Sequence, residues 1–94
     1  MQQEKIGVDI PERTVHHLKT RVVFFEAILT GAKTFEIRYN DRDFQVEDGL
    51  ILQEWDDRNP MEEGHFTGRE IQRTITYITD FQQRPGYVVM GISR

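Results

Sequence analysis

The stretch GAKTFEIR, residues 31–38, sets a glycine in front of a segment in which charged and apolar residues alternate. Its charged residues are Lys33, Glu36 and Arg38. Because successive side chains of a strand point to opposite faces, this pattern predicts a half-buried strand with Phe35 and Ile37 on the core side. The opposite, charged face is then either solvated or a site that holds an anionic or polar ligand.

The residues before this strand carry the pattern of an amphipathic helix. In residues 21–31, RVVFFEAILTG, apolar side chains recur at steps of three and four and fall on one face. Gly31 stands where a helix C-cap glycine belongs. A helix that ends there delivers Lys33 to the mouth of a pocket floored by the next strand.

The rest of the chain predicts further strands, with Gly91 indicating a bulge in the last of them. They are expected at residues 14–20, 50–55, 69–81 and 87–93. We expect an α+β, mostly β fold: a small, antiparallel-dominated β-barrel of about five to six strands with one main helix packed beside it. The expected core includes Phe25, Leu29, Phe35, Ile37, Leu52, Ile75 and Val89.

Length and composition place limits on the fold and the partners. The 94 residues predict one domain at 14–94 behind a poorly ordered arm at 1–13. A hydrophobic content of 37% and a charged content of 30% are ordinary for a soluble protein, and no segment is apolar enough to span a membrane. Cysteine is absent, which excludes disulfides and fits a cytoplasmic protein. The net charge of −4 argues against non-specific attraction to nucleic acid but permits a compact basic pocket.

Common catalytic and metal-binding motifs are missing. Ser93 is the single serine and lies next to the end of the chain, which argues against a serine–histidine–acid triad. His16 and His17 are adjacent, so on a strand they point to opposite faces and do not share one metal. We therefore expect no metal and no cofactor, and we interpret His16 as a buried, hydrogen-bonded histidine.

A family resemblance rests on several segments spread from residue 16 to residue 92. They are HHLK (16–19), FFEAILTGAKTFEIR (24–38), NDRDFQVED (40–48), LILQEW (50–55), TGREI (67–71), TYITDF (76–81) and PGYVVMGI (85–92). The run at 31–38 resembles the G-x-K-x-x-[E/T]-x-R signature of ASCH domains, which have the PUA-like fold. More closely, the chain resembles a small ASCH-related group of bacterial and phage proteins long filed as a domain of unknown function.

This resemblance implies a fold, a ligand class and an alternative activity. PUA-like domains are small barrels that generally bind RNA or modified nucleobases. Some ASCH proteins hydrolyse acylated cytidine or cleave RNA, and in the amidohydrolases the signature lysine acts with a threonine three residues later and a distant glutamate. Here Lys33 keeps the lysine, whereas Glu36 stands at the position of the threonine. Lys33 and Glu36 are accordingly the candidate catalytic pair.

We interpret the chain as a module that binds RNA or a modified nucleotide or nucleoside. The candidate ligand-binding residues are Lys33, Glu36, Arg38, Lys19, Arg42 and Trp55. Trp55 is included because a base stacks on an aromatic ring, although a core or rim position is an equally common role for a single tryptophan. Two alternatives stay open: an ASCH-type hydrolase, either an amidohydrolase or a ribonuclease, that uses Lys33, and a phage-encoded protein-interaction domain. The sequence leaves the oligomeric state undetermined.

Overall fold

The structure is a computed structural model that describes residues 13–94, so all but Arg13 of the predicted arm at 1–13 lies outside the described residues. Its elements are β1 (Val15–Arg21), α1 (Val22–Leu29), β2 (Phe35–Tyr39), β3 (Gly49–Asp56), β4 (His65–Thr79) and β5 (Tyr87–Ile92). The predicted strands and helix are confirmed, except that β4 begins earlier than expected. Within the described part of the chain, no helix is long and apolar enough to cross a membrane.

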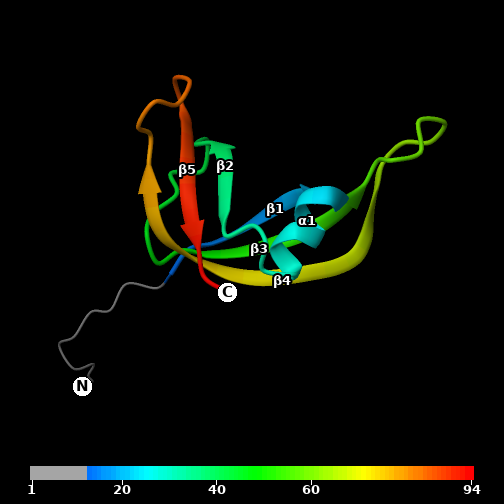
Figure 1. Ribbon diagram of the computed structural model, residues 1–94, viewed down its shortest axis with the longest axis horizontal. Coiled ribbons are helices and arrows are strands. Elements are labelled where there is room, and N and C mark those ends of the chain that lie inside the picture. The colour runs from blue at the N-terminus through cyan, green and yellow to red at the C-terminus, as the bar shows by residue number, and fades with distance from the viewer. Residues whose placement is uncertain (1–12) are drawn as a thin grey trace, which may run out of the picture.

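The strands form one mixed sheet in the order β1-β3-β4-β5-β2. β1 pairs parallel with β3, and the other three neighbouring pairs are antiparallel. β4 is long and bent, because its first part pairs with β3 and its second part with β5 (Figure 1). The α+β, mostly β class is confirmed. The closed barrel is wrong, since in residues 13–94 no ladder joins the edge strands β1 and β2.

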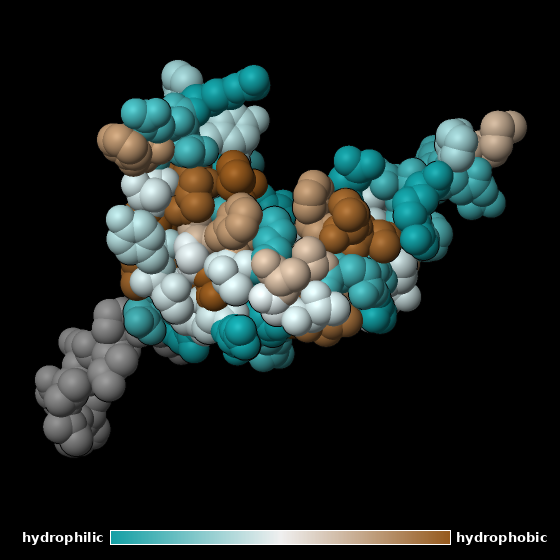
Figure 2. Space-filling view, in the orientation of Figure 1, coloured by the Kyte–Doolittle hydropathy of each residue, from teal (hydrophilic) through white to brown (hydrophobic). Residues whose placement is uncertain are grey.

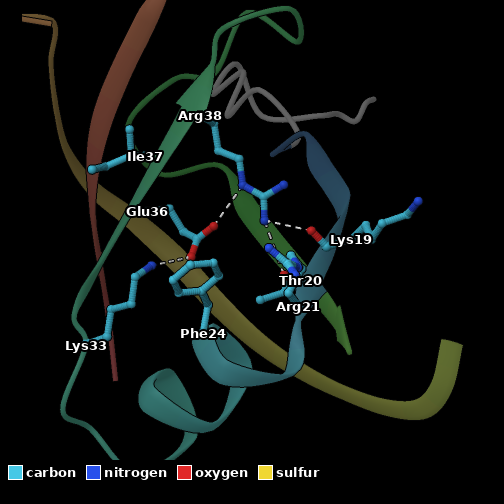
Figure 3. Close-up of a pocket in the computed structure, with 8 residues that line it drawn as sticks. All are labelled: Lys19, Thr20, Arg21, Phe24, Lys33, Glu36, Ile37 and Arg38. Carbon is cyan, nitrogen blue, oxygen red and sulfur yellow. Dashed lines mark hydrogen bonds and ion pairs between the residues drawn. The ribbon is translucent and has the colours of Figure 1, made fainter. Parts of the chain in front are cut away.

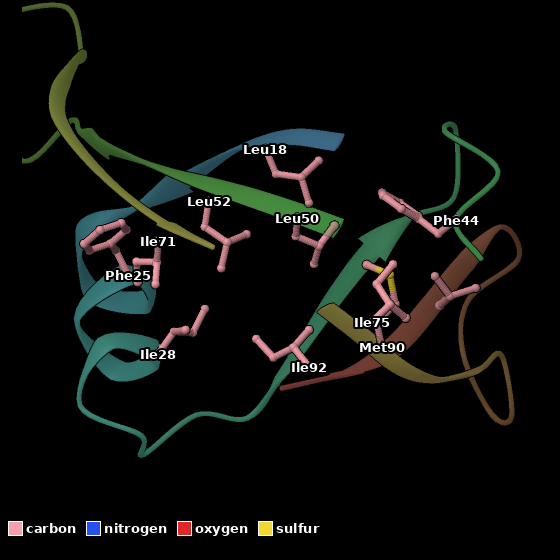
Figure 4. Packing of buried hydrophobic residues seen from close by; sticks show 11 residues of the cluster. Leu18, Phe25, Ile28, Phe44, Leu50, Leu52, Ile71, Ile75, Met90 and Ile92 are labelled. Carbon is pink, nitrogen blue, oxygen red and sulfur yellow. The ribbon is translucent and has the colours of Figure 1, made fainter. Parts of the chain in front are cut away.

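The hydrophobic core lies along the inner face of the bent sheet; α1 covers one end of it, and Phe44, Ile75 and Met90 lie at the other end, beside β2 and β5 (Figure 4). Phe25, Leu52 and Ile75 are at most 1% exposed, which confirms three of the predicted core residues. The other buried hydrophobic residues are Leu18, Ile28, Phe44, Leu50, Ile71, Val88, Met90 and Ile92. α1 presents Phe25 and Ile28 to this core, as its apolar face predicts, but Leu29 at its end is 45% exposed.

The predicted orientation of β2 is wrong. Phe35 and Ile37 are 40% and 52% exposed, whereas Glu36 is 3% exposed and points inward. The pairing with β5 explains the reversal, because Glu36 and its neighbour Met90 share the inner face of the sheet. A carboxylate tolerates this position only when cations or hydrogen-bond donors satisfy it. Val89, on the outer face with Ile37, is only partly buried.

A bulge in β4 explains a second difference from the sequence pattern. Ile75 pairs with Ile92 and Tyr77 with Gly91, so β4 carries one extra residue at this level. The sequence predicts the bulge at Gly91 of β5, but the extra residue lies in β4, opposite Gly91. Because one inserted residue moves the following side chains to the other face, Tyr77 is 63% exposed although Ile75 is fully buried.

Candidate functional site

The candidate site is a hollow between the two edge strands of the sheet and the start of α1 (Figure 3). Its volume is about 300 Å³. The lining residues are Lys19, Thr20 and Arg21 of β1, Phe24 of α1, Lys33 of the α1–β2 connection, and Glu36, Ile37 and Arg38 of β2. The site therefore occupies the gap that a closed barrel would fill with a β-ladder.

Glu36 lies at the centre of the site and contacts two cations. Its Oε2 accepts a hydrogen bond from Lys33 Nζ at 2.9 Å, and its Oε1 accepts one from Arg38 Nε at 2.8 Å. The Glu36 side chain is 4% exposed, against 18% for Lys33 and 25% for Arg38. A buried carboxylate is costly unless it is paired, and here each oxygen has its own cationic donor. Glu36 thus fixes the positions of both cations.

The end of α1 explains how Lys33 reaches this carboxylate. Gly31 adopts a left-handed backbone with φ of +86°, which glycine accepts without strain. Its N–H donates to the carbonyl of Ile28, and the N–H of Lys33 donates to that of Ala27. The chain thereby folds back against the helix. Lys33 Nζ also donates to the carbonyl of Phe35 at 2.7 Å, which holds the ammonium over the start of β2.

Arginine side chains bridge the gap between the sheet edges. Arg38 Nη2 donates to the carbonyl of Lys19 at 2.9 Å and to Thr20 Oγ1 at 3.2 Å. Arg42, in the β2–β3 connection, donates to the carbonyl of His17 at 3.0 Å. The carbonyls of His17 and Lys19 in β1 thus accept hydrogen bonds from guanidinium groups and not from a neighbouring strand. This arrangement explains why the sheet curls without closing.

Some donor groups of Lys33 and Arg38 remain available to the hollow. Lys33 has three N–H groups, two of which have acceptors in the described residues. Arg38 uses Nε and Nη2, and its Nη1 has no acceptor within residues 13–94. In Figure 3 both cationic side chains converge on Glu36 beside the Phe24 ring. The site therefore offers oriented donors to a ligand with oxygen acceptors.

Hydrophobic residues flank the charged centre. Phe24 and Ile37, which line the hollow, are 45% and 52% exposed. The Lys33 ammonium lies 5.5 Å from the ring centroid of Phe24 and 4.9 Å from that of Phe35. Figure 2 shows hydrophobic surface over α1 and over β2, with hydrophilic surface between them. A ligand that fits this arrangement combines a polar or anionic group with an apolar or aromatic body.

The predicted ligand-binding residues are only partly brought together. Lys33, Glu36 and Arg38 form one contact network, as the sequence pattern predicts. Lys19 lines the hollow and supplies its backbone carbonyl to Arg38, but its ammonium lies 3.9 Å above the ring of Trp55. Arg42 bridges to β1 and is not part of the lining.

Trp55 lies away from the hollow and packs within the β3–β4 hairpin. Its ring contacts Phe66 edge to face at a centroid distance of 4.8 Å. A Cβ atom at Gly64 would lie 2.4 Å from the indole Nε1, so the Gly64 backbone closely covers the ring. With Lys19 above it as well, Trp55 has little free surface for stacking on a base.

Thr20 and Phe24 are site residues that the sequence reasoning missed. Thr20 shares the inward side of β1 with His16 and Leu18, and this alternation could have placed it inside. Phe24 falls off the apolar face of α1, so an exposed aromatic ring at the start of the helix was the available signal. His16 is 6% exposed and its Nε2 lies 2.8 Å from Asp48 Oδ2, which confirms a buried, hydrogen-bonded histidine.

A second buried carboxylate, Glu54 of β3, lies beside Thr20 in the β1–β3 register. It accepts hydrogen bonds from Thr67 Oγ1 at 2.7 Å and from Arg69 Nε and Nη2 at 3.0 Å each. Arg69 also pairs with Glu26 of α1. The Arg69 hydrogen bonds lower the pKa of Glu54 against the opposing effect of burial, and the same bonds raise the pKa of Arg69. This group ties β3, β4 and α1 together.

No cluster of three or more metal-ligating side chains occurs within the described range. The charged and aromatic side chains that line the hollow are four cations, one carboxylate and one aromatic ring: Lys19, Arg21, Lys33, Arg38, Glu36 and Phe24.

Comparisons with known proteins identify the family. Residues 15–92 match the family model described as a domain of unknown function, DUF3850. The chain is also similar to a protein of Escherichia phage P2, described as an uncharacterized 12.9 kDa protein in the GpA 3′ region, with 38% identity over 66 residues. That match covers 70% of this chain and 55% of the phage protein, so it spans about half the length of this relative. The wider relation to ASCH and PUA-like domains stays a prediction. The chain belongs to the DUF3850 family.

Proposed function

We propose that the hollow between β1 and β2 binds a nucleotide, free or as part of RNA, and that the domain is a nucleotide- or RNA-binding module. One observation carries this proposal. A buried carboxylate, Glu36, holds Lys33 and Arg38, and both cations line a hollow beside an exposed aromatic ring.

The charges of the site favour an anionic group in the ligand. Lys33 and Arg38 contribute two positive charges and Glu36 one negative charge, so the contact network is positive although the whole chain is negative. Hydrogen bonds from charged donors to phosphate are shorter and stronger than neutral ones. An ammonium and a guanidinium side by side suit the several oxygens of a phosphate. Glu36 acts as a positioning residue, because both its oxygens already accept hydrogen bonds from these cations.

The aromatic wall favours a nucleoside as the rest of the ligand. Every base has a flat face that stacks on aromatic side chains, and Phe24 offers such a ring at the hollow. A volume of about 300 Å³ is at the lower end of the range of small-molecule sites. The resemblance of residues 31–38 to the ASCH signature supports the same ligand class, since PUA-like domains generally bind RNA or modified nucleobases.

A hydrolase is the weaker alternative. Glu36 stands where the amidohydrolases of the ASCH group have a threonine. Its carboxylate already forms ion pairs with Lys33 and Arg38. Among the residues that line the hollow in the described chain, Glu36 is the single carboxylate. The second acid required by that chemistry therefore has no counterpart in the lining.

The test is an equilibrium titration of the protein with the four common ribonucleoside 5′-monophosphates, with the corresponding nucleosides and with single-stranded RNA hexamers. We expect saturable binding of at least one monophosphate and at least tenfold weaker binding of its nucleoside, because the nucleoside leaves the Lys33 and Arg38 donors without an acceptor. Arg84→Ala, which removes a charge in the β4–β5 turn, is the matched control and should bind as wild type. If neither the monophosphates nor RNA bind, the proposal is wrong and the protein-interaction alternative becomes the better account.

A further inference from the structure

We infer that the site recognises one nucleotide unit, a free nucleoside monophosphate, with its base on Phe24 and its phosphate on Lys33 and Arg38, and that it does not follow a strand of RNA. This inference rests on the proposed function. Three features of the structure carry it: the pairing of the neighbouring arginines with carboxylates, the size of the hollow, and the position of the aromatic ring.

Three arginines in or next to the site, of which Arg21 belongs to the lining, already contact carboxylates. These pairs are Arg21 with Asp57, Arg42 with Asp41, and Arg69 with Glu26 and Glu54. A protein that follows an RNA backbone neutralises successive phosphates with basic side chains along a groove. Here the carboxylates beside these arginines would repel the phosphates that precede and follow the bound nucleotide. Arg73 and Arg94, which line a second hollow together with Lys33, are not among these pairs and provide the test described below.

The size of the hollow leads to the same conclusion. At about 300 Å³ it has room for one small ligand, and its walls come from two facing strand edges and one helix. Arg38 crosses the gap between those edges to the carbonyl of Lys19, and Arg42 crosses it to that of His17. The gap is therefore bridged on the β2–β3 side of the hollow, which limits how a polymer could pass through it.

Phe24 is the residue placed to recognise the base. It lines the hollow, is 45% exposed, and its ring centroid lies 5.5 Å from the Lys33 ammonium. Trp55, the other candidate for stacking, has its ring in contact with the Lys19 ammonium and close to the Gly64 backbone, and it is not part of the lining. One aromatic ring next to one pair of cations matches one base attached to one phosphate.

A second hollow provides a way to refute this inference. It has a volume of about 140 Å³, adjoins the end of α1, and is lined by Arg73 and Arg94 as well as Lys33. If RNA crossed the site, its next phosphate would reach these arginines. If RNA crosses the site, Arg73→Ala should weaken the binding of RNA. If the site takes a single nucleotide, Arg73→Ala should leave the binding of a monophosphate unchanged.

The experiment compares the four ribonucleoside 5′-monophosphates with single-stranded RNA hexamers of the same bases, each titrated at several salt concentrations. We expect the best monophosphate to bind within about threefold of its hexamer, and the hexamer to show a shallow logarithmic salt slope of about −1 to −2, as for about two neutralised phosphates. Phe24→Leu should weaken monophosphate binding about tenfold, as expected for the loss of base stacking. The matched control is Tyr77→Leu, which removes an exposed aromatic ring on the outer face of β4 and should have no effect.

The outcomes separate the two proposals. Hexamer binding more than tenfold tighter than monophosphate binding, with a steep salt slope and a loss on Arg73→Ala, would overturn the single-nucleotide inference and leave the proposed function standing. Unchanged monophosphate binding by folded Phe24→Leu would overturn the assignment of the base to Phe24. Absence of binding by both probes overturns the proposed function and this inference with it.

Discussion

Glu36 of β2 and Glu54 of β3 are both buried carboxylates on the inner face of the sheet, but their surroundings differ. Glu36 contacts two cations, Lys33 and Arg38, so its group carries one excess positive charge. Glu54 shares the single cation Arg69 with a second carboxylate, Glu26, so its group carries one excess negative charge.

The two groups also differ in their position relative to the hollow. Arg69 directs Nε and Nη2 at carboxylates, and its hydrogen bonds join β4 to β3 and α1. In residues 13–94 the Nη1 groups of Arg38 and Arg69 both lack an acceptor, but Lys33 and Arg38 line the hollow, whereas Arg69 is not among its lining residues. Under the proposed function, the Glu54 group stabilises the fold, whereas the Glu36 group binds a ligand.

The largest effect is expected for Glu36→Ala, because it leaves two partly buried cations without their counter-charge. We expect the free energy of unfolding to fall by about 3 kcal/mol, the lower end for a broken buried ion pair, since Lys33 and Arg38 keep some contact with water. Nucleotide binding should also be weakened, because the two donors lose the carboxylate that fixes them relative to each other. Urea unfolding and ligand titration measure the two effects.

Glu54→Ala is the matched variant. It should lower stability as well, but the folded fraction should bind a nucleotide as wild type does. Equal loss of binding in both variants, measured where each is folded, would mean that the two groups do not differ in the way described here.

A smaller effect is expected for Lys33→Arg. A planar guanidinium does not reproduce the compact ammonium that contacts both Glu36 and the Phe35 carbonyl. We expect binding between that of wild type and that of Lys33→Ala, which should lose roughly 1–3 kcal/mol as for a charge-assisted contact. Isothermal titration of the three proteins gives the order. Full recovery by arginine would show that only the charge at this position matters.

The Glu54 group predicts a dependence of stability on pH. Arg69 lowers the pKa of Glu54 in the folded state below its ordinary value of 4.5. A carboxyl with a lowered folded-state pKa adds stability that is fully present above the unfolded-state pKa and is lost as the pH falls through the folded-state pKa. The difference in urea midpoint between wild type and Glu54→Gln should therefore be largest above about pH 5 and shrink on acidification. A difference that stays constant from pH 6 to pH 2.5 would contradict this.

We expect the protein to show no hydrolase activity. Incubation of the pure protein with acylated cytidine should give no turnover, because Glu36 replaces the threonine and both its oxygens already contact cations. Turnover that is abolished by Lys33→Ala would show instead that the hydrolase alternative is correct. Chromatography of the reaction mixture detects either outcome.

The sequence predicted the elements and the contacting set Lys33, Glu36 and Arg38, because alternation along a strand and a glycine after a helix are local signals. It assigned the wrong face to the core, since Phe35 and Ile37 are the residues expected inside. The pattern shows that two faces differ but not which one is buried. Here Glu36 is inside because Lys33 from the preceding turn and Arg38 from the same strand neutralise it.

Other features depend on contacts between distant segments and could not be predicted locally. The extra residue in β4 turns Tyr77 outward, and only the pairing with Gly91 reveals it. The sheet stays open because Arg38 and Arg42 satisfy carbonyls of β1, which lies about twenty residues earlier in the chain. Trp55 packs against Phe66 and Gly64, which come from the other side of the β3–β4 hairpin, and not against the residues of the hollow.

The most direct test of the central claim is the paired measurement of nucleotide affinity and thermal stability for wild type, Lys33→Ala, Arg38→Ala and Arg84→Ala. If Lys33 and Arg38 are the donors that hold the ligand, each alanine variant should lose roughly 1–3 kcal/mol of binding free energy at a temperature where it is folded. Arg84→Ala, with the same change of net charge, should bind as wild type. Folded Lys33→Ala and Arg38→Ala proteins that bind a monophosphate with wild-type affinity would show that the Glu36 group serves the fold alone.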